Sequence, residues 1–112
     1  MKRASGYLLL STGLAVGLTA CDLLPKRSLG EQVWRKRCAE CHGLDGAGNT
    51  PRYMGQPYAD LLDDSWNYGS DEVAIESAIR DGILGKMPPS PELSRDEVRA
   101  VMEYLKELRR NR

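Results

Sequence analysis

Apolar residues recur at helical spacing in three separate parts of the chain after residue 28. In the first part, residues 29–41, the row Gly30, Trp34 and Cys38 follows four-residue steps that continue to His42. Residues four apart share one face of a helix, so these four residues are expected to lie on the same face. Strand-like alternation of apolar and polar positions is absent from the sequence, and the pattern therefore predicts an all-α domain.

Two further helices have clear start signals. Ser70 is a candidate N-cap for a helix that runs through Arg80 and ends at Gly82. Ser94 and Glu97 have the spacing of a capping box, which predicts the start of the last helix. The apolar stripe of that helix consists of Val98, Val101, Met102, Leu105 and Leu108.

The segments between these helices are rich in glycine and proline. Residues 43–56 contain four glycines and Pro51, and they show no apolar period, which indicates a long ordered loop. Pro57 suits a first helical position, so a short helix is expected over Tyr58 to Asp64. Residues 83–93 contain three prolines, which forbid a regular helix and favour an extended strap.

The N-terminal segment has the features of a targeting signal. Two basic residues precede an apolar run from Tyr7 to Leu18, and the run ends at Leu18-Thr19-Ala20-Cys21. This ending resembles a bacterial lipoprotein signal, in which the cysteine is acylated and becomes the mature N-terminus. The run is short for a membrane span, which disfavours an uncleaved anchor helix, and its ending in two small residues and a cysteine disfavours an ordinary signal.

These observations predict three parts. Residues 1–20 are a lipoprotein signal peptide, residues 21–28 are a tether lipidated at Cys21, and residues 29–112 are the folded domain. The short tether would hold the domain at the periplasmic face of the bacterial inner membrane. Asp22 resembles the retention signal of lipoproteins that stay in that membrane.

Composition narrows the possible functions. The full chain of 112 residues has 16 basic and 16 acidic residues, and loss of Lys2 and Arg3 with the signal leaves 14 basic against 16 acidic. Basic residues do not gather with aromatic residues, so nucleic acid is not an expected partner. The chain has no Phe and only three cysteines. A domain this small with so little to stabilise it is expected to need a bound cofactor.

The sequence Cys38-Ala39-Glu40-Cys41-His42 has the C-x-x-C-H spacing of a haem c attachment site. Both thiols add to the vinyl groups of one haem, and the two cysteines lie about one helical turn apart on the same face. His42 continues that face, so its imidazole is expected to be the proximal iron ligand.

Three other interpretations of these residues are weaker. A thioredoxin-like pair needs a βαβ context, which the pattern does not contain. A zinc site needs four ligands, whereas Cys38, Cys41 and His42 supply three. A disulfide between the two cysteines would leave the histidine and the glycine-rich loop unexplained.

The sixth iron ligand cannot be a second histidine of the chain, because His42 is its only one. Met1 leaves with the signal, and Met102 lies in the apolar stripe of the last helix, where it is expected to fill the core. Met54 lies in the glycine-rich loop. Met87 precedes two prolines in a stiff strap, so Met87 is the preferred distal ligand.

Together these residues resemble class I cytochrome c from Leu29 to Leu108. The family has a glycine eight residues before the first haem cysteine and an aromatic residue midway, which match Gly30 and Trp34. The resemblance extends to the last helix and to the strap, through the residues Val101, Tyr104, Leu105 and the Gly-Lys-Met-Pro sequence at 85–88.

The resemblance implies the class I cytochrome c fold, with N- and C-terminal helices that cross at Gly30 and a haem-wrapped core with long loops. In the family a proline carbonyl accepts the ring N–H of the haem histidine, and both Pro51 and Pro57 are candidates here. Four aromatic residues could reach the haem propionates, although packing is the commoner role for such residues: Tyr53, Tyr58, Trp66 and Tyr68.

With both axial positions filled by the protein, the expected function is outer-sphere transfer of single electrons rather than enzymatic conversion of a small-molecule substrate. The expected electron donor is a quinol-oxidising complex or dehydrogenase, and the acceptor is an oxidase or reductase. Basic residues 35–37 could steer an acidic partner, but a solvated helix face is the preferred explanation for such a run of charges. The alternative function is that of a haem c subunit in a larger redox enzyme or sensor with an exchangeable distal ligand.

Overall fold

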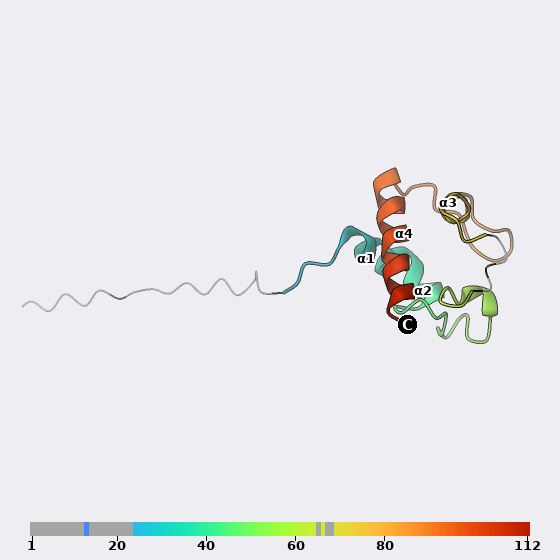
Figure 1. Ribbon diagram of the computed structural model, residues 1–112, viewed down its shortest axis with the longest axis horizontal. Helices are drawn as coiled ribbons and strands as arrows, with labels where there is room; N and C mark the ends of the chain where they lie inside the picture. Colours follow the sequence, from blue (N-terminus) through green and yellow to red (C-terminus); the bar gives the residue numbers. More distant parts are fainter. Residues whose placement is uncertain (1–12, 14–23, 65, 67–68) are drawn as a thin grey trace, which may run out of the picture.

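The computed structural model describes residues 13, 24–64, 66 and 69–112 (Figure 1). Within that part of the chain every regular element is a helix, as predicted, and the only strand-type pairing is an isolated bridge between Ile83 and Met87. None of the described helices combines the length and apolar character that a membrane span requires. Cys21 and, apart from Gly13, the predicted signal peptide lie outside the described residues.

The first helical segment has three parts. Helix α1 covers Leu29–Val33, a π-helical turn η2 covers Trp34–Cys38, and α2 covers Ala39–His42. The Ser28 hydroxyl caps α1 by accepting from the amide of Glu31 at 3.1 Å. A continuous α-helix was the prediction, and the π turn is the difference: the amide of Ala39 donates to the carbonyl of Trp34, five residues back. Such turns inside helices are frequently found at functional sites.

Helix α4, Arg95–Arg110, begins with the predicted capping box and crosses α1 (Figure 1). The two helices meet at Gly30, where an added Cβ atom would lie 2.2 Å from the carbonyl oxygen of Ala100 and 2.9 Å from Cβ of Tyr104. Any side chain at this position would hold the helices apart. The expected crossing at Gly30 is therefore confirmed.

Helix α3, Glu72–Asp81, begins one residue later than predicted. Its N-cap is Asp71 rather than Ser70, because the Asp71 carboxylate accepts from the amide of Ala74 at 3.0 Å. A carboxylate at this end also interacts favourably with the helix dipole, which a hydroxyl does not. The helix ends at Gly82, as predicted, with a φ of +71°.

The helix expected over Tyr58 to Asp64 does not form. Only a single 3₁₀ turn, η3, is present at Pro57–Ala59. The chain leaves this turn at Asp60, whose backbone is extended and whose carboxylate accepts from the amide of Leu62 at 2.8 Å. Aspartate side chains commonly bond nearby backbone amides in this way, and such a bond competes with the backbone bonds that would continue a helix.

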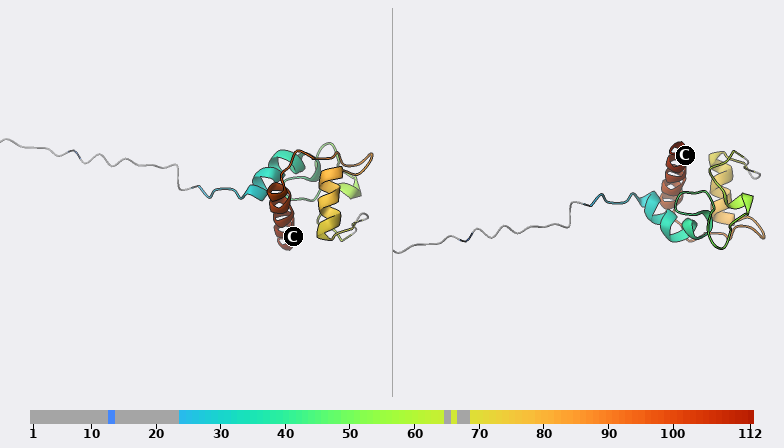
Figure 2. Two further views of the ribbon diagram at one scale, coloured as in Figure 1. Left: turned by 90° about the horizontal axis from the view of Figure 1, so that it is seen from above. Right: turned by 90° about the horizontal axis from the view of Figure 1, so that it is seen from below.

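The buried core lies between α1, the π turn and α4. The predicted stripe of α4 supplies four of its residues, and Leu108 packs against them. The further views in Figure 2 show α3 beside α4, with the loop 43–56 and the strap 83–93 completing the domain. The core residues are Val33, Trp34, Leu93, Val98, Val101, Met102 and Leu105.

Candidate functional site

A largely apolar cavity lies between the first helical segment, α3, α4 and the strap. The first segment contributes Cys38, Cys41 and His42, and the strap contributes Met87. All four residues predicted to hold haem therefore face one cavity. Its apolar walls include Trp34, Leu61, Trp66, Ile75, Ile79, Ile83, Leu93, Val101 and Leu105.

The two cysteines are free thiols in the structure, which argues against the disulfide alternative. Burial, with a smaller contribution from the charge of Cys41, raises the pKa of the Cys38 thiol to about 11. A thioredoxin-type nucleophile has the opposite shift, toward a lower pKa. Among the described residues, no group of three or more His, Cys, Asp and Glu side chains has a metal-binding arrangement.

His42 is oriented by a hydrogen bond from its ring. Nδ1 lies 2.8 Å from the carbonyl oxygen of Ala59, which can only accept, so Nδ1 carries the proton and Nε2 is left to bind a metal. Burial lowers the pKa of the imidazole, and the bond to Ala59 opposes that shift. The acceptor was expected to be Pro51 or Pro57. It is neither, because the 3₁₀ turn begun by Pro57 presents the carbonyl of its last residue.

The loop before this turn packs closely on Ala59. Gly48, with a φ of +71°, donates its amide to the His42 carbonyl at 2.8 Å. A Cβ atom at Gly48 would lie 2.6 Å from the carbonyl carbon of Ala59, so only glycine fits there. The histidine and its acceptor are thus held by the same loop residue.

Trp34 joins the helix crossing to the site. It is 2% exposed, and its ring N–H donates to the carbonyl of Gly43 at 3.0 Å. Its ring centroid lies 6.1 Å from that of His42 and 6.0 Å from that of Tyr104. The predicted aromatic position is therefore a packing contact that limits movement of the imidazole.

Met87 is positioned by a tight turn in the strap. Ile83 and Met87 exchange two backbone hydrogen bonds of 2.8 Å each. Gly82 packs directly against this turn, and only glycine fits there because an added Cβ atom would lie 2.5 Å from the Met87 carbonyl oxygen. Of the other methionines, Met54 is 70% exposed and away from the cavity, whereas Met102 lines it from the core of α4.

Aromatic and basic side chains also line the cavity. Tyr53 and Tyr58 pack edge to face at 6.3 Å between ring centroids, and Lys86 Nζ lies 5.5 Å from the centroid of Tyr58. Both tyrosines and Trp66 line the cavity, whereas Tyr68 lies outside the described residues. Arg37, one of the three consecutive basic residues, also lines it and pairs with Glu92 of the strap at 3.1 Å.

Sequence reasoning missed Ala59 and Arg109. Ala59 has a side chain without chemical function, and only its carbonyl matters. Arg109 was not among the candidate residues, yet its guanidinium donates to the carbonyls of Leu61 and Asp63. The pairing of a C-terminal arginine with a loop more than forty residues earlier has no local sequence signal.

The cavity fits a covalently bound haem on three observations. The first helical segment supplies two thiols one turn apart and an imidazole whose Nε2 is available. The strap supplies a methionine thioether, and the cavity walls are apolar. These donors and apolar surroundings suit a haem attached through two thioethers and ligated by histidine and methionine.

Comparison with known proteins agrees with this geometry. The family model described as cytochrome C oxidase, cbb3-type, subunit III matches residues 26–105. The cbb3-type cytochrome c oxidase subunit CcoP of Rhodobacter capsulatus is 36% identical in an alignment 91 residues long, and the match covers 74% of this chain and 29% of that protein. The subunit FixP of Bradyrhizobium diazoefficiens is 38% identical in an alignment 80 residues long, and the match covers 70% of this chain and 26% of that protein.

The chain thus spans less than a third of the length of these two relatives. Among solved structures, the KustC0563 c-type cytochrome superposes with a TM-score of 0.60 at 25% identity, over 70% of this chain and 95% of that one. The expected cytochrome c fold is confirmed. The chain belongs to the c-type cytochrome family described as cytochrome c oxidase, cbb3-type, subunit III, and its cofactor is covalently attached haem c.

Proposed function

We propose that this protein carries single electrons through one haem attached at Cys38 and Cys41, with His42 as the proximal and Met87 as the distal iron ligand. The observation that supports this ligand set best is that all four side chains line one apolar cavity. The orientation of His42 supports it further, because the bond to Ala59 leaves Nε2 as the coordinating nitrogen.

The haem supplies the redox chemistry, and the polypeptide tunes and isolates it. The apolar walls would keep water from a bound haem, and a thioether from Met87 would favour the ferrous state, so both features would raise the reduction potential. With His42 and Met87 both holding the iron, no substrate would coordinate it. The chain therefore passes electrons to other redox proteins and does not convert a small molecule itself.

The ligand assignment is tested by absorption spectroscopy on the exported protein. Pyridine haemochrome bands should show covalent haem, and a weak near-red band from sulfur to ferric iron should be present in the wild type. That band should disappear in Met87→Ala and persist in Met54→Ala, the exposed methionine. Its survival in Met87→Ala would exclude Met87 as the ligand.

We also propose that Cys21 is lipidated and holds the domain at the periplasmic face of the inner membrane. The support is the signal-like segment that ends at this cysteine, followed by a tether of eight residues, 21–28. Cys21→Ser should move the protein from the membrane fraction to the soluble periplasmic extract. Retention of the serine variant in membranes would contradict the anchor.

A second candidate function is favoured by the relatives, which are subunits of cbb3-type oxidases. In this case the domain is a fixed electron-entry subunit of a larger oxidase rather than a free carrier between a quinol-oxidising complex and an acceptor. Mild detergent extraction followed by native gel electrophoresis with haem staining separates the two functions. A free carrier migrates alone, whereas a subunit migrates with the oxidase.

A further inference from the structure

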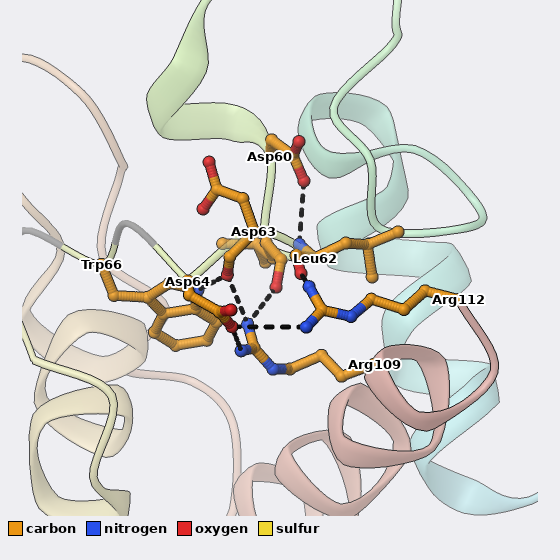
Figure 3. A network of polar contacts seen from close by, with 8 residues as sticks. Asp60, Leu62, Asp63, Asp64, Trp66, Arg109 and Arg112 are labelled. Atoms are coloured by element: carbon orange, nitrogen blue, oxygen red, sulfur yellow. Dashed lines mark hydrogen bonds and ion pairs between the residues drawn. The ribbon is translucent and has the colours of Figure 1, made fainter.

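The C-terminal end of α4 is bound to the loop that follows η3 (Figure 3). The Arg109 guanidinium donates to the carbonyls of Leu61 at 2.6 Å and Asp63 at 3.0 Å, and it pairs with the Asp64 carboxylate at 3.2 Å. Its Cζ atom also lies 4.8 Å from the ring centroid of Trp66. One side chain thus makes four contacts with a loop that lines the haem cavity.

The backbone contacts, rather than the ion pair, give this arrangement its strength. The Asp64 side chain is 80% exposed, and an ion pair with so exposed a partner contributes little. The Arg109 side chain is only 26% exposed, and its bonds to carbonyls are charge-assisted. Stacking on Trp66 adds a cation–π contact, and the ring N–H of that tryptophan donates to the same Asp63 carbonyl at 3.0 Å.

Arg112, two residues after the end of α4, adds to this contact. Its guanidinium donates to the carbonyl of Leu62 and lies 3.4 Å from the Asp64 carboxylate (Figure 3). Three consecutive carbonyls, those of residues 61–63, are therefore each bonded by an arginine of the C-terminal end. Arg110, between the two arginines in sequence, is exposed.

This loop determines where the acceptor of the proximal histidine lies. Ala59, whose carbonyl accepts from His42, is only two residues before Leu61. The amide of Leu61 donates to Gly46 at 2.9 Å, and the side chain of Leu62 packs against Gly46. The segment is fixed on one side by the glycine-rich loop and on the other by Arg109, so the Ala59 carbonyl has little freedom.

We propose that Arg109 is a positioning residue for the proximal haem ligand: by bonding the carbonyls of the loop after Ala59, it keeps that carbonyl on the ring N–H of His42. The inference rests on the proposed role of His42 as iron ligand. A histidine whose ring N–H is hydrogen-bonded is a more basic ligand. Greater basicity stabilises ferric iron, so Arg109 lowers the reduction potential through Ala59.

The sign of the change distinguishes this role from general loosening of the domain. Loss of the bond to His42 raises the potential, because the ligand becomes less basic. Entry of water into the cavity, and loss of a positive charge near the haem, both stabilise the ferric form and lower the potential. A variant that keeps the charge but not the planar fork therefore isolates the positioning effect.

The test compares Arg109→Lys with Arg110→Lys in the full exported protein. Arg109→Lys is expected to raise the reduction potential, whereas Arg110→Lys leaves it at the wild-type value. In the ferrous protein, proton NMR should also show the His42 Nδ1 proton exchanging with solvent about tenfold faster or more in Arg109→Lys only. Arg112→Lys, which loses one carbonyl bond, should raise the potential by a smaller amount and replaces Arg109→Lys if that variant does not accumulate.

An unchanged or lowered potential with unchanged ring-proton exchange would overturn the positioning role while leaving the haem assignment intact. Colourless wild-type protein would instead refute the proposed function itself.

Discussion

Gly48 offers a quantitative test of how the proximal side of the site is built. Its φ is +71°, and a Cβ atom added there would lie 2.6 Å from the carbonyl carbon of Ala59. Carbon atoms in contact are normally about 3.5–4.0 Å apart, so Gly48→Ala requires a displacement of roughly 1 Å. That displacement is enough to break the 2.8 Å bond from His42 Nδ1 to the Ala59 oxygen, since such bonds extend to about 3.2 Å.

Gly55 is a matched control in the same loop. Its φ is +80°, but nothing lies within 4 Å of an added Cβ. Gly55→Ala should therefore cost only the left-handed backbone penalty of about 1–2 kcal/mol. Gly48→Ala should cost that penalty and an overpacking term of about 1–3 kcal/mol.

Denaturant and thermal unfolding of the haem-loaded protein, both followed by far-ultraviolet circular dichroism, measure the two unfolding free energies and the two Tm values. In a domain of this size the extra cost should lower the Tm of Gly48→Ala by roughly 5–20 °C relative to Gly55→Ala. Gly48→Ala alone should also raise the reduction potential. Equal unfolding free energies for the two variants would refute the steric argument.

Three further predictions concern other parts of the fold. Gly82→Ala should displace the Met87 carbonyl, which lies 2.5 Å from the added Cβ, and weaken the near-red methionine band in the absorption spectrum. Gly30→Ala should destabilise the domain by about 3 kcal/mol in urea unfolding, because its Cβ would lie 2.2 Å from the Ala100 oxygen. The pKa of Glu97 is lowered by its bond to the N-cap backbone, so its contribution to stability is present above the unfolded pKa and is lost as pH falls through the folded one. Glu97→Gln should therefore flatten the acid side of a stability curve measured from pH 7 to pH 3, and an unaltered curve would contradict this.

The elements with strong local signals were predictable. The capping box of α4 and its apolar stripe depend on spacing within one helix, and both are present. The glycine at the helix crossing was expected from the family resemblance, and its contact with Ala100 confirms it. The N-cap of α3 was misplaced by one residue because Ser70 and Asp71 are both good caps, and only the geometry shows which one bonds an amide.

The supporting structure of the site could not be predicted for a different reason. The acceptor of His42 is a backbone carbonyl, which every residue has, so Ala59 is indistinguishable from its neighbours in the sequence. The helix expected over residues 58–64 fails because Asp60 bonds the amide of Leu62, and the arginines of α4 then bond the carbonyls that remain. The bonds from the arginines join residues 46–50 positions apart in the sequence, a separation at which helical or strand periodicity carries no information.

Both tryptophans of the chain line the cavity, Trp34 from the π turn and Trp66 from the loop bonded by Arg109. A haem in that cavity accepts excitation energy from nearby indole rings, so tryptophan fluorescence should be almost completely quenched in the native protein. Emission from Trp34 would report on unfolding at the helix crossing, and emission from Trp66 on unfolding of the loop bonded by Arg109. With one of the two replaced by Phe, the emission regained during unfolding would show which region opens first, without any added label.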